Sequence, residues 1–428
     1  MKDTGEIVWD VCVIGGGPAG MMAAGQAAAL GARVVLLEKN TTLGKKLLIT
    51  GGGRCNVCNG EEDVRKLLSK FKGSDKFLFS AFSQWSTKDT LDFFHTRGMD
   101  TKVEALLRVF PASNTAQSVW DVLVQNLKKH DVTVLSNSPV TSIQSKDGEV
   151  VSVTLKNKKE ILAKKFIVAT GGKSRPETGS TGEGYEWLKE LGHNVTGTNA
   201  ALVPLAIKDM WVKKLAGVSA QDVKITTFQN NVKQNVQLGK ILFTHVGVSG
   251  PTILNMSRDI GELLNYGDVN VEVDFAHALG YDALNTKLQE VFAKNDKKKL
   301  KNSLSELLPT AVVSVLLELA GIDGDVECNS VTRTTRLALL KAIKHASMDV
   351  DKLLGLEKAV ITSGGVDLEE VDFKTMQSRL FPNLYLVGDI LNINRPSGGY
   401  SLQLCWTTGH VAGTHAALGH SPTGEAQK

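Results

Sequence analysis

The fold is decided by the stretch Asp10-Val-Cys-Val-Ile-Gly15-Gly16-Gly17-Pro18-Ala19-Gly20. It joins a run typical of a buried strand to a helix of small residues, and a second strand, Arg33 to Glu38, follows. In such a G-x-G-x-x-G turn, Gly15 permits the tight bend, Gly17 lets the backbone approach a pyrophosphate, and Gly20 lets helix and strand pack closely. Because a helix N-terminus also offers free N–H groups and a partial positive charge, the pattern predicts a βαβ unit that binds a dinucleotide.

Two acidic residues narrow the choice of dinucleotide. Glu38, followed by Lys39, ends the second strand, where its carboxylate would accept hydrogen bonds from ribose hydroxyls. An acid at this place disfavours a 2′-phosphate and leaves FAD or NAD. Far along the chain, Leu386-Val-Gly388-Asp389 has the form of a late strand that ends in an acid holding the ribityl hydroxyls of FAD. An NAD dehydrogenase does not need a late strand that ends in such an acid, so the two acidic residues together favour FAD.

Length and charge exclude several classes of protein. A chain of 428 residues exceeds what one hydrophobic core usually serves, so we expect two or three domains. The formal net charge of +4 is mild, and the lysine-rich stretches at 156–159 and 297–301 lack interleaved aromatic residues. A nucleic-acid partner is therefore not expected, because a phosphate-tracking surface normally shows as a concentrated basic stripe.

Hydropathy and cysteine usage indicate the compartment. The first residues include no apolar segment of a signal peptide, and no later run of about 18 apolar residues could span a bilayer. The five cysteines form an odd and scattered set, which argues against a secreted disulfide framework. We therefore expect a cytoplasmic protein with reduced thiols and no membrane partner.

The order of strand-like and helix-like segments in the remaining sequence predicts an insertion. The α/β pattern continues to about residue 200, and a strand, a glycine turn and a helix return after Gly364. Between them lie strand-like segments followed by helical periodicity. We therefore expect an α/β protein in which a discontinuous Rossmann-type FAD-binding domain (1–200 and 356–428) is interrupted by a β-rich domain (201–280) and a small helical domain (281–355).

Five further motifs make the chain resemble the YhiN/BaiN-like flavoprotein family nearly from end to end. They are Gly51-Gly-Gly-Arg54-Cys55-Asn56, Arg108-Val-Phe-Pro-Ala-Ser113, Ala169-Thr-Gly-Gly172, Phe243-Thr-His-Val-Gly-Val-Ser-Gly-Pro251 and Gly398-Gly-Tyr-Ser-Leu-Gln403. The resemblance implies a relative of fumarate reductase flavoproteins, with an FAD domain interrupted by β-rich and helical domains. Activities attached to the family are aminoacetone oxidation and NAD(P)H-dependent reduction of steroid enones, and the resemblance indicates the fold more securely than the reaction.

The resemblance also implies contacts with the two ends of FAD. The loop from Lys45 to Gly53 would contact the cofactor, and Arg54, Cys55 and Asn56 would follow it near the flavin. Val140 would contact the adenine through its backbone.

Two further segments are assigned by the same resemblance. Ala169, Thr170 and Gly171 would end a strand beside the pyrophosphate or the ribityl chain. A helix would begin at the segment Gly399-Tyr400-Ser401-Leu402-Gln403, with its N-terminus facing the flavin pyrimidine carbonyls. Backbone N–H donors and a positive helix end there would stabilise a reduced, anionic flavin.

Just before the segment that begins at Gly399, the sequence differs from the motif that is commoner in the family. It has Asp389 where Glu is frequent, Asn392 and Asn394 where acids are expected, and Arg395 where a glycine is expected. If Arg395 points inward, one added cation and fewer acids should raise the flavin potential. An exposed Arg before Pro396 would have no such effect.

A C-x-x-C motif offers a competing chemistry. Cys55-Asn-Val-Cys58 beside a flavin invites the interpretation of a disulfide oxidoreductase. Such enzymes carry a second G-x-G-x-x-G for NAD(P)H, and Gly179-Ser-Thr-Gly182-Glu-Gly184 has the wrong spacing. A zinc site would need a second pair of ligands, so no metal is predicted.

Three residues are candidates for a catalytic role. His245 lies in a glycine-rich segment and has a suitable intrinsic pKa for proton transfer, although a lone His is more often hydrogen-bonded structure. Arg54 and Tyr400 are comparable candidates for binding a substrate carboxylate or carbonyl.

Together the motifs favour an FAD-dependent oxidoreductase that reduces an activated C=C bond of a small organic substrate. NAD(P)H would be a diffusible donor, since no second dinucleotide motif is present, and both substrates would take turns at flavin N5 in a ping-pong cycle. The alternatives are an amine or aminoketone oxidase that releases H₂O₂, and a non-catalytic redox-responsive flavoprotein.

Overall fold

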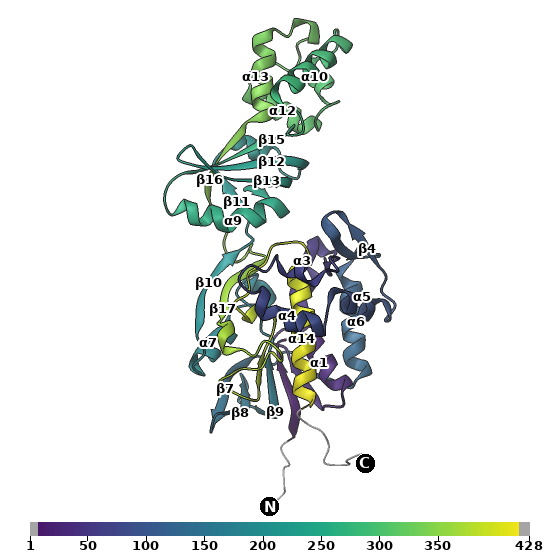
Figure 1. Ribbon diagram of the computed structural model, residues 1–428, viewed down its shortest axis with the longest axis vertical. Coiled ribbons are helices and arrows are strands. Elements are labelled where there is room, and N and C mark those ends of the chain that lie inside the picture. Colours follow the sequence, from purple (N-terminus) through teal and green to yellow (C-terminus); the bar gives the residue numbers. More distant parts are fainter. Residues whose placement is uncertain (1–6, 419–428) are drawn as a thin grey trace, which may run out of the picture. The chain divides into compact units, whose positions relative to one another are not determined.

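The computed structural model describes residues 7–418, which form two compact units (Figure 1). One unit contains the chain up to Ala200 and again from Ala359, and the other contains Ala201–Lys358. The first unit therefore resumes three residues after the boundary expected at residue 356. The ends of the expected Rossmann domain, residues 1–6 and 419–428, lie outside the described residues.

The first unit is built on a seven-stranded sheet in the order β6-β2-β1-β9-β8-β7, with β18 pairing with the carboxyl end of β9. Strands β6, β2, β1, β9 and β18 run parallel, whereas β7, β8 and β9 form an antiparallel meander. The strands are β1 (Val8–Ile14), β2 (Val34–Leu37), β6 (Thr133–Leu135), β7 (Val140–Lys146), β8 (Glu149–Leu155), β9 (Glu160–Val168) and β18 (Leu384–Leu386). The order reverses at β1, and such a switch point leaves a crevice at the carboxyl ends of the strands. The predicted Rossmann-type α/β domain is confirmed.

Helices α1 (Pro18–Ala29) and α14 (Tyr400–Leu418) lie side by side in this unit (Figure 1). Their approach depends on small residues, because a Cβ on Gly409 would lie 2.5 Å from the Ala19 carbonyl oxygen. The helices of the intervening segments are α2 (Lys45–Leu48), α3 (Val64–Leu68), α4 (Asp75–Gln84), α5 (Thr87–His95), α6 (Ala116–Lys129) and α7 (Glu183–Glu190).

Two small sheets complete the first unit. A three-stranded sheet has the order β3-β5-β4, and a two-stranded sheet pairs β10 with β17. Their strands are β3 (Cys58–Asn59), β4 (Thr101–Glu104), β5 (Arg108–Pro111), β10 (Val195–Ala201) and β17 (Ile361–Val366). Short 3₁₀ turns, including η1 (Thr50–Gly53) and η6 (Gly388–Ile390), join these pieces to the main sheet.

The second unit contains a closed barrel in the order β11-β14-β13-β12-β15-β16. The strands are β11 (Leu205–Ile207), β12 (Ser219–Gln229), β13 (Val232–Phe243), β14 (Gly247–Ser249), β15 (Val269–Asp274) and β16 (Ala346–Leu353), with helices α8 (Met210–Lys214) and α9 (Pro251–Leu264). Four helices lie between β15 and β16, namely α10 (Tyr281–Lys294), α11 (Leu300–Leu304), α12 (Thr310–Leu319) and α13 (Arg333–Lys344).

The expected division into a β-rich domain (201–280) and a helical domain (281–355) needs one correction. Residues 346–353 form barrel strand β16, which pairs with β11 and β15. In addition, Leu288 and Leu340 of the helices share one buried core with Ile225 of the barrel. The helices are therefore an excursion between two barrel strands. Across residues 7–418, the structure has no helix with the length and apolar character that crossing a bilayer requires.

Candidate functional site

The turn after β1 forms one wall of a cavity at the switch point. Gly15 has a φ of +108°, and a Cβ there would lie 2.6 Å from the Ala169 carbonyl oxygen at the end of β9. A Cβ on Gly20 would lie 1.9 Å from the Gly15 carbonyl oxygen, so helix and turn require glycine at both positions. A Cβ on Gly17 would meet no heavy atom within 4 Å, because this glycine faces the open cavity. Gly17 caps α1 without a side-chain acceptor, so the first N–H groups of the helix remain available to an anion.

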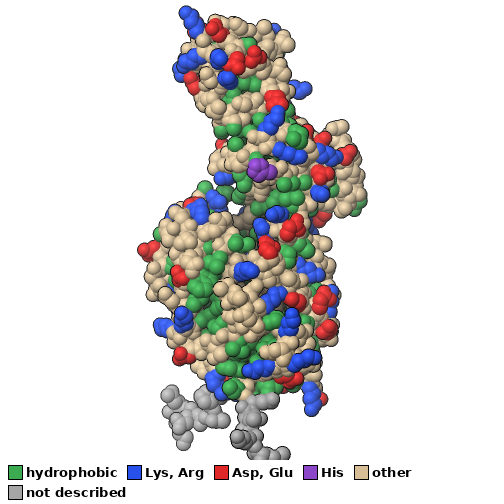
Figure 2. All heavy atoms as spheres, turned by 180° about the vertical axis from the view of Figure 1, so that it is seen from behind, with side chains coloured by type: hydrophobic (Ala, Val, Ile, Leu, Met, Phe, Trp, Pro, Cys, Tyr) green, Lys and Arg blue, Asp and Glu red, His purple; other side chains and the backbone are tan. Residues whose placement is uncertain are grey.

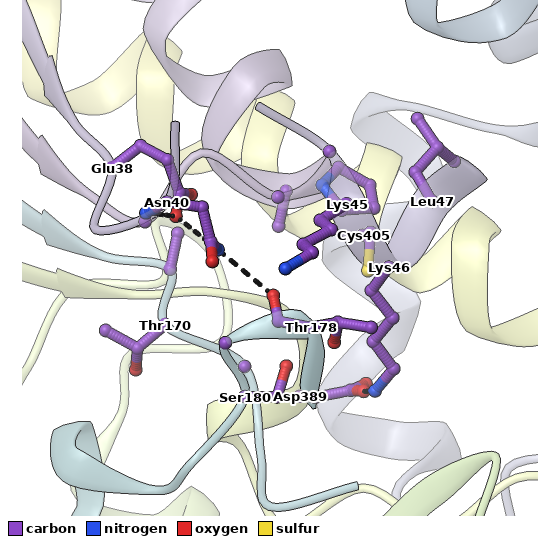
Figure 3. A pocket seen from close by; sticks show the side chains of 18 of the residues that line it. Glu38, Asn40, Lys45, Lys46, Leu47, Thr170, Thr178, Ser180, Asp389 and Cys405 are labelled. Carbon is purple, nitrogen blue, oxygen red and sulfur yellow. Dashed lines mark hydrogen bonds and ion pairs between the residues drawn. The ribbon is translucent and has the colours of Figure 1, made fainter. Parts of the chain in front are cut away.

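Glu38 follows the end of β2 and is held beside this turn. Its Oε2 accepts a hydrogen bond from the Gly16 N–H at 2.9 Å, and its Oε1 accepts from the backbone N and the Nδ2 of Asn40, both at 2.7 Å. The side chain of Asn40 also donates to the Thr178 carbonyl at 3.1 Å (Figure 3). The carboxylate is thus fixed in the wall of the cavity.

The cavity encloses about 1170 Å³ of space, including its open mouth. The predicted cofactor residues in its lining are Gly15, Gly17, Pro18, Ala19, Glu38, Lys39, Lys45, Val140, Ala169, Thr170, Gly171, Asp389, Ser401 and Leu402. Segments far apart in the sequence therefore meet at the edge of the sheet where the switch point predicts a ligand.

Asp389 lies on η6, after β18, and joins the lining from the other end of the chain. Its carboxylate pairs with the Arg395 guanidinium, and its Oδ2 lies 3.7 Å from Lys46 Nζ. Burial acts to raise the pKa of this carboxyl, but Arg395 and Lys46 outweigh burial and hold the pKa below its usual range. Arg395 is buried and points inward, which excludes the exposed alternative.

Several predicted residues lie outside the cavity lining. They are Gly20, Gly53, Arg54, Cys55, Asn56, Gly388, Gly399, Tyr400 and His245. Gly20 and Gly399 have tight packing roles, since a Cβ on Gly399 would lie 2.2 Å from the Cys58 carbonyl carbon. Glycines at such positions shape the walls while larger neighbours form the surface.

Arg54 is bound within the first unit. Its guanidinium pairs with Glu104, donates to Asn114 Oδ1 at 2.7 Å, and lies 4.2 Å from the centre of the Phe110 ring. This arrangement joins η1 to β4 and β5. Recruiting Arg54 to a substrate would require breaking the pair with Glu104.

The C-x-x-C motif contains two fully buried thiols. Burial raises the pKa of Cys55 to about 12 and also raises that of Cys58, so neither is a ready thiolate. All five cysteines are unpaired. Among residues 7–418, no group of three or more His, Cys, Asp or Glu side chains is arranged to hold a metal ion.

Tyr400 and His245 lie in different units. Tyr400 begins α14 and packs edge-to-face on Phe71, with ring centres 5.8 Å apart. Burial, followed by the charge of Glu61, raises the pKa of its hydroxyl. His245 is exposed in the turn between β13 and β14 of the barrel unit.

One wall of the cavity was not predicted from the sequence. Thr178, Ser180 and Glu183 line it, and Glu183 accepts a hydrogen bond from Lys39 Nζ at 2.6 Å. The signal was the glycine cluster from Gly179 to Gly184, which was considered only as a second dinucleotide motif. Gly179 and Gly182 have φ values of +104° and +87°, so the glycines serve a tight turn. Lys46, in the loop from Lys45 to Gly53 that was expected to contact the cofactor, also lines the cavity, and its approach to Asp389 was not predicted.

These features fit FAD. A glycine turn with free N–H groups can take the pyrophosphate, and carboxylates at both ends of the cavity can accept hydroxyl hydrogen bonds. In addition, Thr170 Oγ1 is buried in the lining without a hydrogen-bond partner in the structure. A buried hydroxyl of this kind is normally satisfied, so a polar ligand in the cavity would supply what it lacks.

Comparisons with known proteins find relatives along nearly the whole chain. A family model described as "HI0933-like protein Rossmann domain" matches residues 9–415. A 3-dehydro-bile acid delta(4,6)-reductase of Clostridium scindens is 30% identical over 95% of this chain and 98% of its own. A ribosomal RNA dihydrouridine synthase of Escherichia coli is 31% identical over 94% of this chain and 96% of its own.

The fold is also similar to that of solved flavoenzymes. A 3-ketosteroid delta1-dehydrogenase from Sterolibacterium denitrificans superposes with a TM-score of 0.56 at 12% identity, over 96% of this chain and 100% of that one. At such low identity, the likeness concerns the fold alone.

Proposed function

Because the chain belongs to the HI0933-like Rossmann-domain family and is an FAD-dependent oxidoreductase, we propose that it reduces a C=C bond conjugated to a carbonyl group, with NAD(P)H as a diffusible donor. The observation that carries this proposal is the nearly full-length match to the bile-acid delta(4,6)-reductase. The name of that relative describes reduction of C=C bonds in a 3-oxo steroid. Conjugation makes such a bond an acceptor of hydride.

The chain's own residues would hold the cofactor along the cavity. We assign the pyrophosphate to the N–H groups at the start of α1, the adenosine ribose to Glu38, and the ribityl chain to Asp389. The first turn of α14, with Ser401 and Leu402 in the lining, would face the flavin carbonyls. Bound FAD would supply a hydride acceptor and donor at its N5 atom.

Reduction of a conjugated C=C bond also needs a proton at the carbon next to the carbonyl. Tyr400 is our first choice among the three candidate residues, because it directly precedes Ser401 of the cavity lining and a tyrosine hydroxyl carries a proton at neutral pH. Arg54 is less suited to this role, because its guanidinium is paired with Glu104.

Steady-state kinetics test the proposed cycle. With NADPH or NADH varied against a 3-oxo-4-ene steroid, reciprocal plots should give parallel lines, because the sequence has no second dinucleotide motif that would hold NAD(P)H while the steroid binds. Tyr400→Phe should lower kcat about 10²-fold, whereas Tyr266→Phe, at a tyrosine that is 80% exposed in the barrel unit, should leave kcat unchanged. Intersecting lines would count against ping-pong transfer. Release of H₂O₂ from an amine without NAD(P)H would instead support the oxidase alternative.

A second candidate substrate is uracil in ribosomal RNA, favoured by two relatives named ribosomal RNA dihydrouridine synthase, from Escherichia coli and Haemophilus influenzae. The C5=C6 bond of uracil is also conjugated to a carbonyl, so the chemistry is shared. The mild net charge and the interspersed basic and acidic side chains on the face in Figure 2 favour a small substrate. NADPH-dependent formation of dihydrouridine in ribosomal RNA, with no turnover of enones, would select the RNA substrate.

A further inference from the structure

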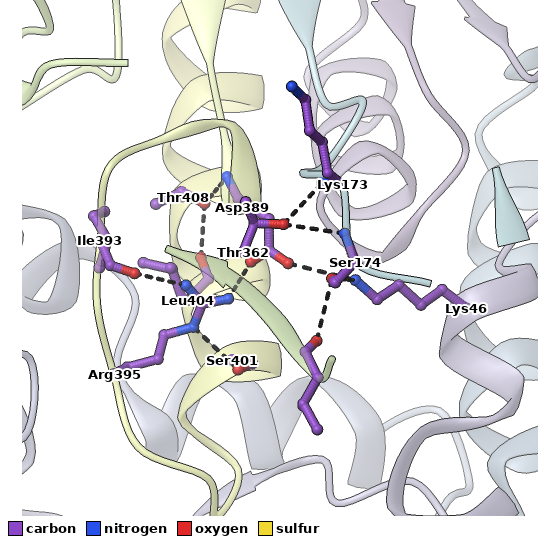
Figure 4. A network of polar contacts seen from close by, with 12 residues as sticks. Lys46, Lys173, Ser174, Thr362, Asp389, Ile393, Arg395, Ser401, Leu404 and Thr408 are labelled. Carbon is purple, nitrogen blue, oxygen red and sulfur yellow. Dashed lines mark hydrogen bonds and ion pairs between the residues drawn. The ribbon is translucent and has the colours of Figure 1, made fainter. Parts of the chain in front are cut away.

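A buried ion-pair network surrounds Asp389 at the edge of the cavity (Figure 4). The guanidinium of Arg395, whose side chain is 1% exposed, pairs with Asp389 Oδ1. Lys46 approaches the other oxygen, with Nζ 3.7 Å from Oδ2. The carboxylate therefore has one cation on each oxygen.

Arg395 joins this carboxylate to the start of α14. Its Nε donates to Ser401 Oγ at 3.0 Å, and its Nη1 donates to the Ile393 carbonyl at 2.8 Å. Asp389 and Ser401 line the cavity, whereas Arg395 does not. The hydrogen bonds of Arg395 therefore reach a bound molecule only through these two side chains.

The opposite side of the network is also fixed. Lys46 Nζ donates to Ser174 Oγ at 2.6 Å, and Ser174 is fully buried. Thr362 Oγ1 accepts from the backbone N–H groups of Lys173 at 2.7 Å and Ser174 at 3.1 Å (Figure 4). Lys46 is thus linked through Ser174 to Thr362 of β17.

The charges of the network keep Asp389 ionised. Burial favours the protonated form of a carboxyl, and here the two cations outweigh burial and lower its pKa. Two further groups near it are neutral, because burial raises the pKa of the Cys405 thiol to about 12 and also raises that of the Tyr185 hydroxyl. Burial lowers the pKa of Lys46, which Asp389 raises, and Arg175 is a further cation near Lys46. Removal of Arg395 would leave a partly uncompensated buried carboxylate, which takes up a proton more readily.

We propose that Arg395 is a positioning residue for FAD, which holds the Asp389 carboxylate ionised and, with the Ser401 hydroxyl, turned toward the cavity. A charged carboxylate accepts stronger hydrogen bonds from ribityl hydroxyls than a neutral carboxyl does. Arg395 therefore makes FAD retention independent of pH across the neutral range. This inference rests on the proposed assignment of Asp389 to the ribityl chain.

Rebinding of FAD to the stripped full-length protein tests it, with the dissociation constant measured by flavin fluorescence between pH 6 and pH 8. The wild-type constant should be flat, because Asp389 is ionised throughout. In Arg395→Met, the constant should rise about tenfold at pH 6 and less at pH 8, since a protonated Asp389 must lose its proton to bind. Arg395→Lys should restore the flat profile.

The control is Arg379→Met, at a half-exposed arginine of the same unit whose partner is Asp372. It should match the wild type at every pH. An Arg395→Met profile parallel to that of the wild type would overturn the role of Arg395. If Asp389→Asn also left the dissociation constant unchanged, the assignment of Asp389 to FAD would fail as well, so the two failures are distinguishable.

A double variant keeps the test valid if Arg395→Met does not fold. Asp389→Asn/Arg395→Met removes the Asp389–Arg395 pair and leaves Lys46 hydrogen-bonded to Ser174, so it should fold and bind FAD as weakly as Asp389→Asn, with no pH dependence. A double variant that still loses FAD as the pH falls would show that another group titrates and would contradict the inference.

Discussion

At the scale of single residues, the cysteines show how burial sets reactivity. All five are buried and unpaired, and burial raises the pKa of Cys55 and Cys405 to about 12. A thiol with a raised pKa stays protonated at pH 8, and only the thiolate reacts rapidly with a disulfide reagent. We therefore expect the native protein to react slowly with such a reagent at pH 8, and five thiols to react in denaturant.

Fast reaction of the native thiols would instead support the interpretation of a disulfide oxidoreductase. Rapid labelling of Cys55 or Cys58 in the native protein, accompanied by a change in flavin absorption, would indicate a dithiol at the flavin. Labelling that appears only on unfolding leaves the C-x-x-C motif as part of the core.

The sequence permitted prediction of residues whose role is local. Gly15 and Gly20 belong to one turn. The backbone atoms that leave no space for a Cβ at these positions belong to Gly15 itself and to Ala169, at the end of the adjacent strand. Arg395 could be interpreted in two ways, because its direction depends on Asp389 and Ser401 in the folded chain. The pairing of Lys46 with Asp389 was not predicted, because the two residues lie at opposite ends of the sequence.

At the scale of elements, the contact between α1 and α14 depends on the absence of side chains. A Cβ on Gly413 would lie 2.4 Å from the Ala23 carbonyl oxygen, which belongs to backbone and cannot yield as a side chain does. Gly413→Val should therefore destabilise the first unit by about 1–3 kcal/mol. Thermal unfolding followed by circular dichroism should show a fall in Tm of several degrees.

A matched control separates crowding from the substitution itself. A Cβ on Gly197 of β10 would meet no heavy atom within 4 Å, so Gly197→Val should leave the Tm nearly unchanged. Equal losses in both variants would mean that helix contact is not the cause.

Strand β16 has a sequence pattern typical of a strand but was not predicted as one. Its residues alternate between buried and exposed, with Ala346, Met348 and Val350 inside. This period of two is a strand signal, but it follows directly on helix α13 and was assigned to the helical domain. Its partners β11 and β15 both precede the helical excursion, so the barrel closes only through contacts distant in sequence.

At the scale of the whole molecule, the barrel unit has its own core and its two ends lie together. Leu205 pairs with Leu353, and the Leu354 N–H donates to the Pro204 carbonyl at 3.0 Å. We therefore expect a fragment of residues 202–358 to fold alone, with a cooperative thermal transition and no bound flavin. A fragment that aggregates or melts without cooperativity would show that its core depends on the first unit.

The central claim is reduction of a conjugated C=C bond through FAD, and a two-step anaerobic titration tests it most directly. Addition of NADPH or NADH to the flavin-loaded protein should bleach the flavin absorption near 450 nm. Addition of a 3-oxo-4-ene steroid to the washed, reduced protein should restore that absorption and yield one saturated product per flavin. A flavin that neither nucleotide bleaches, or that regains its absorption only with O₂, would contradict the proposed function.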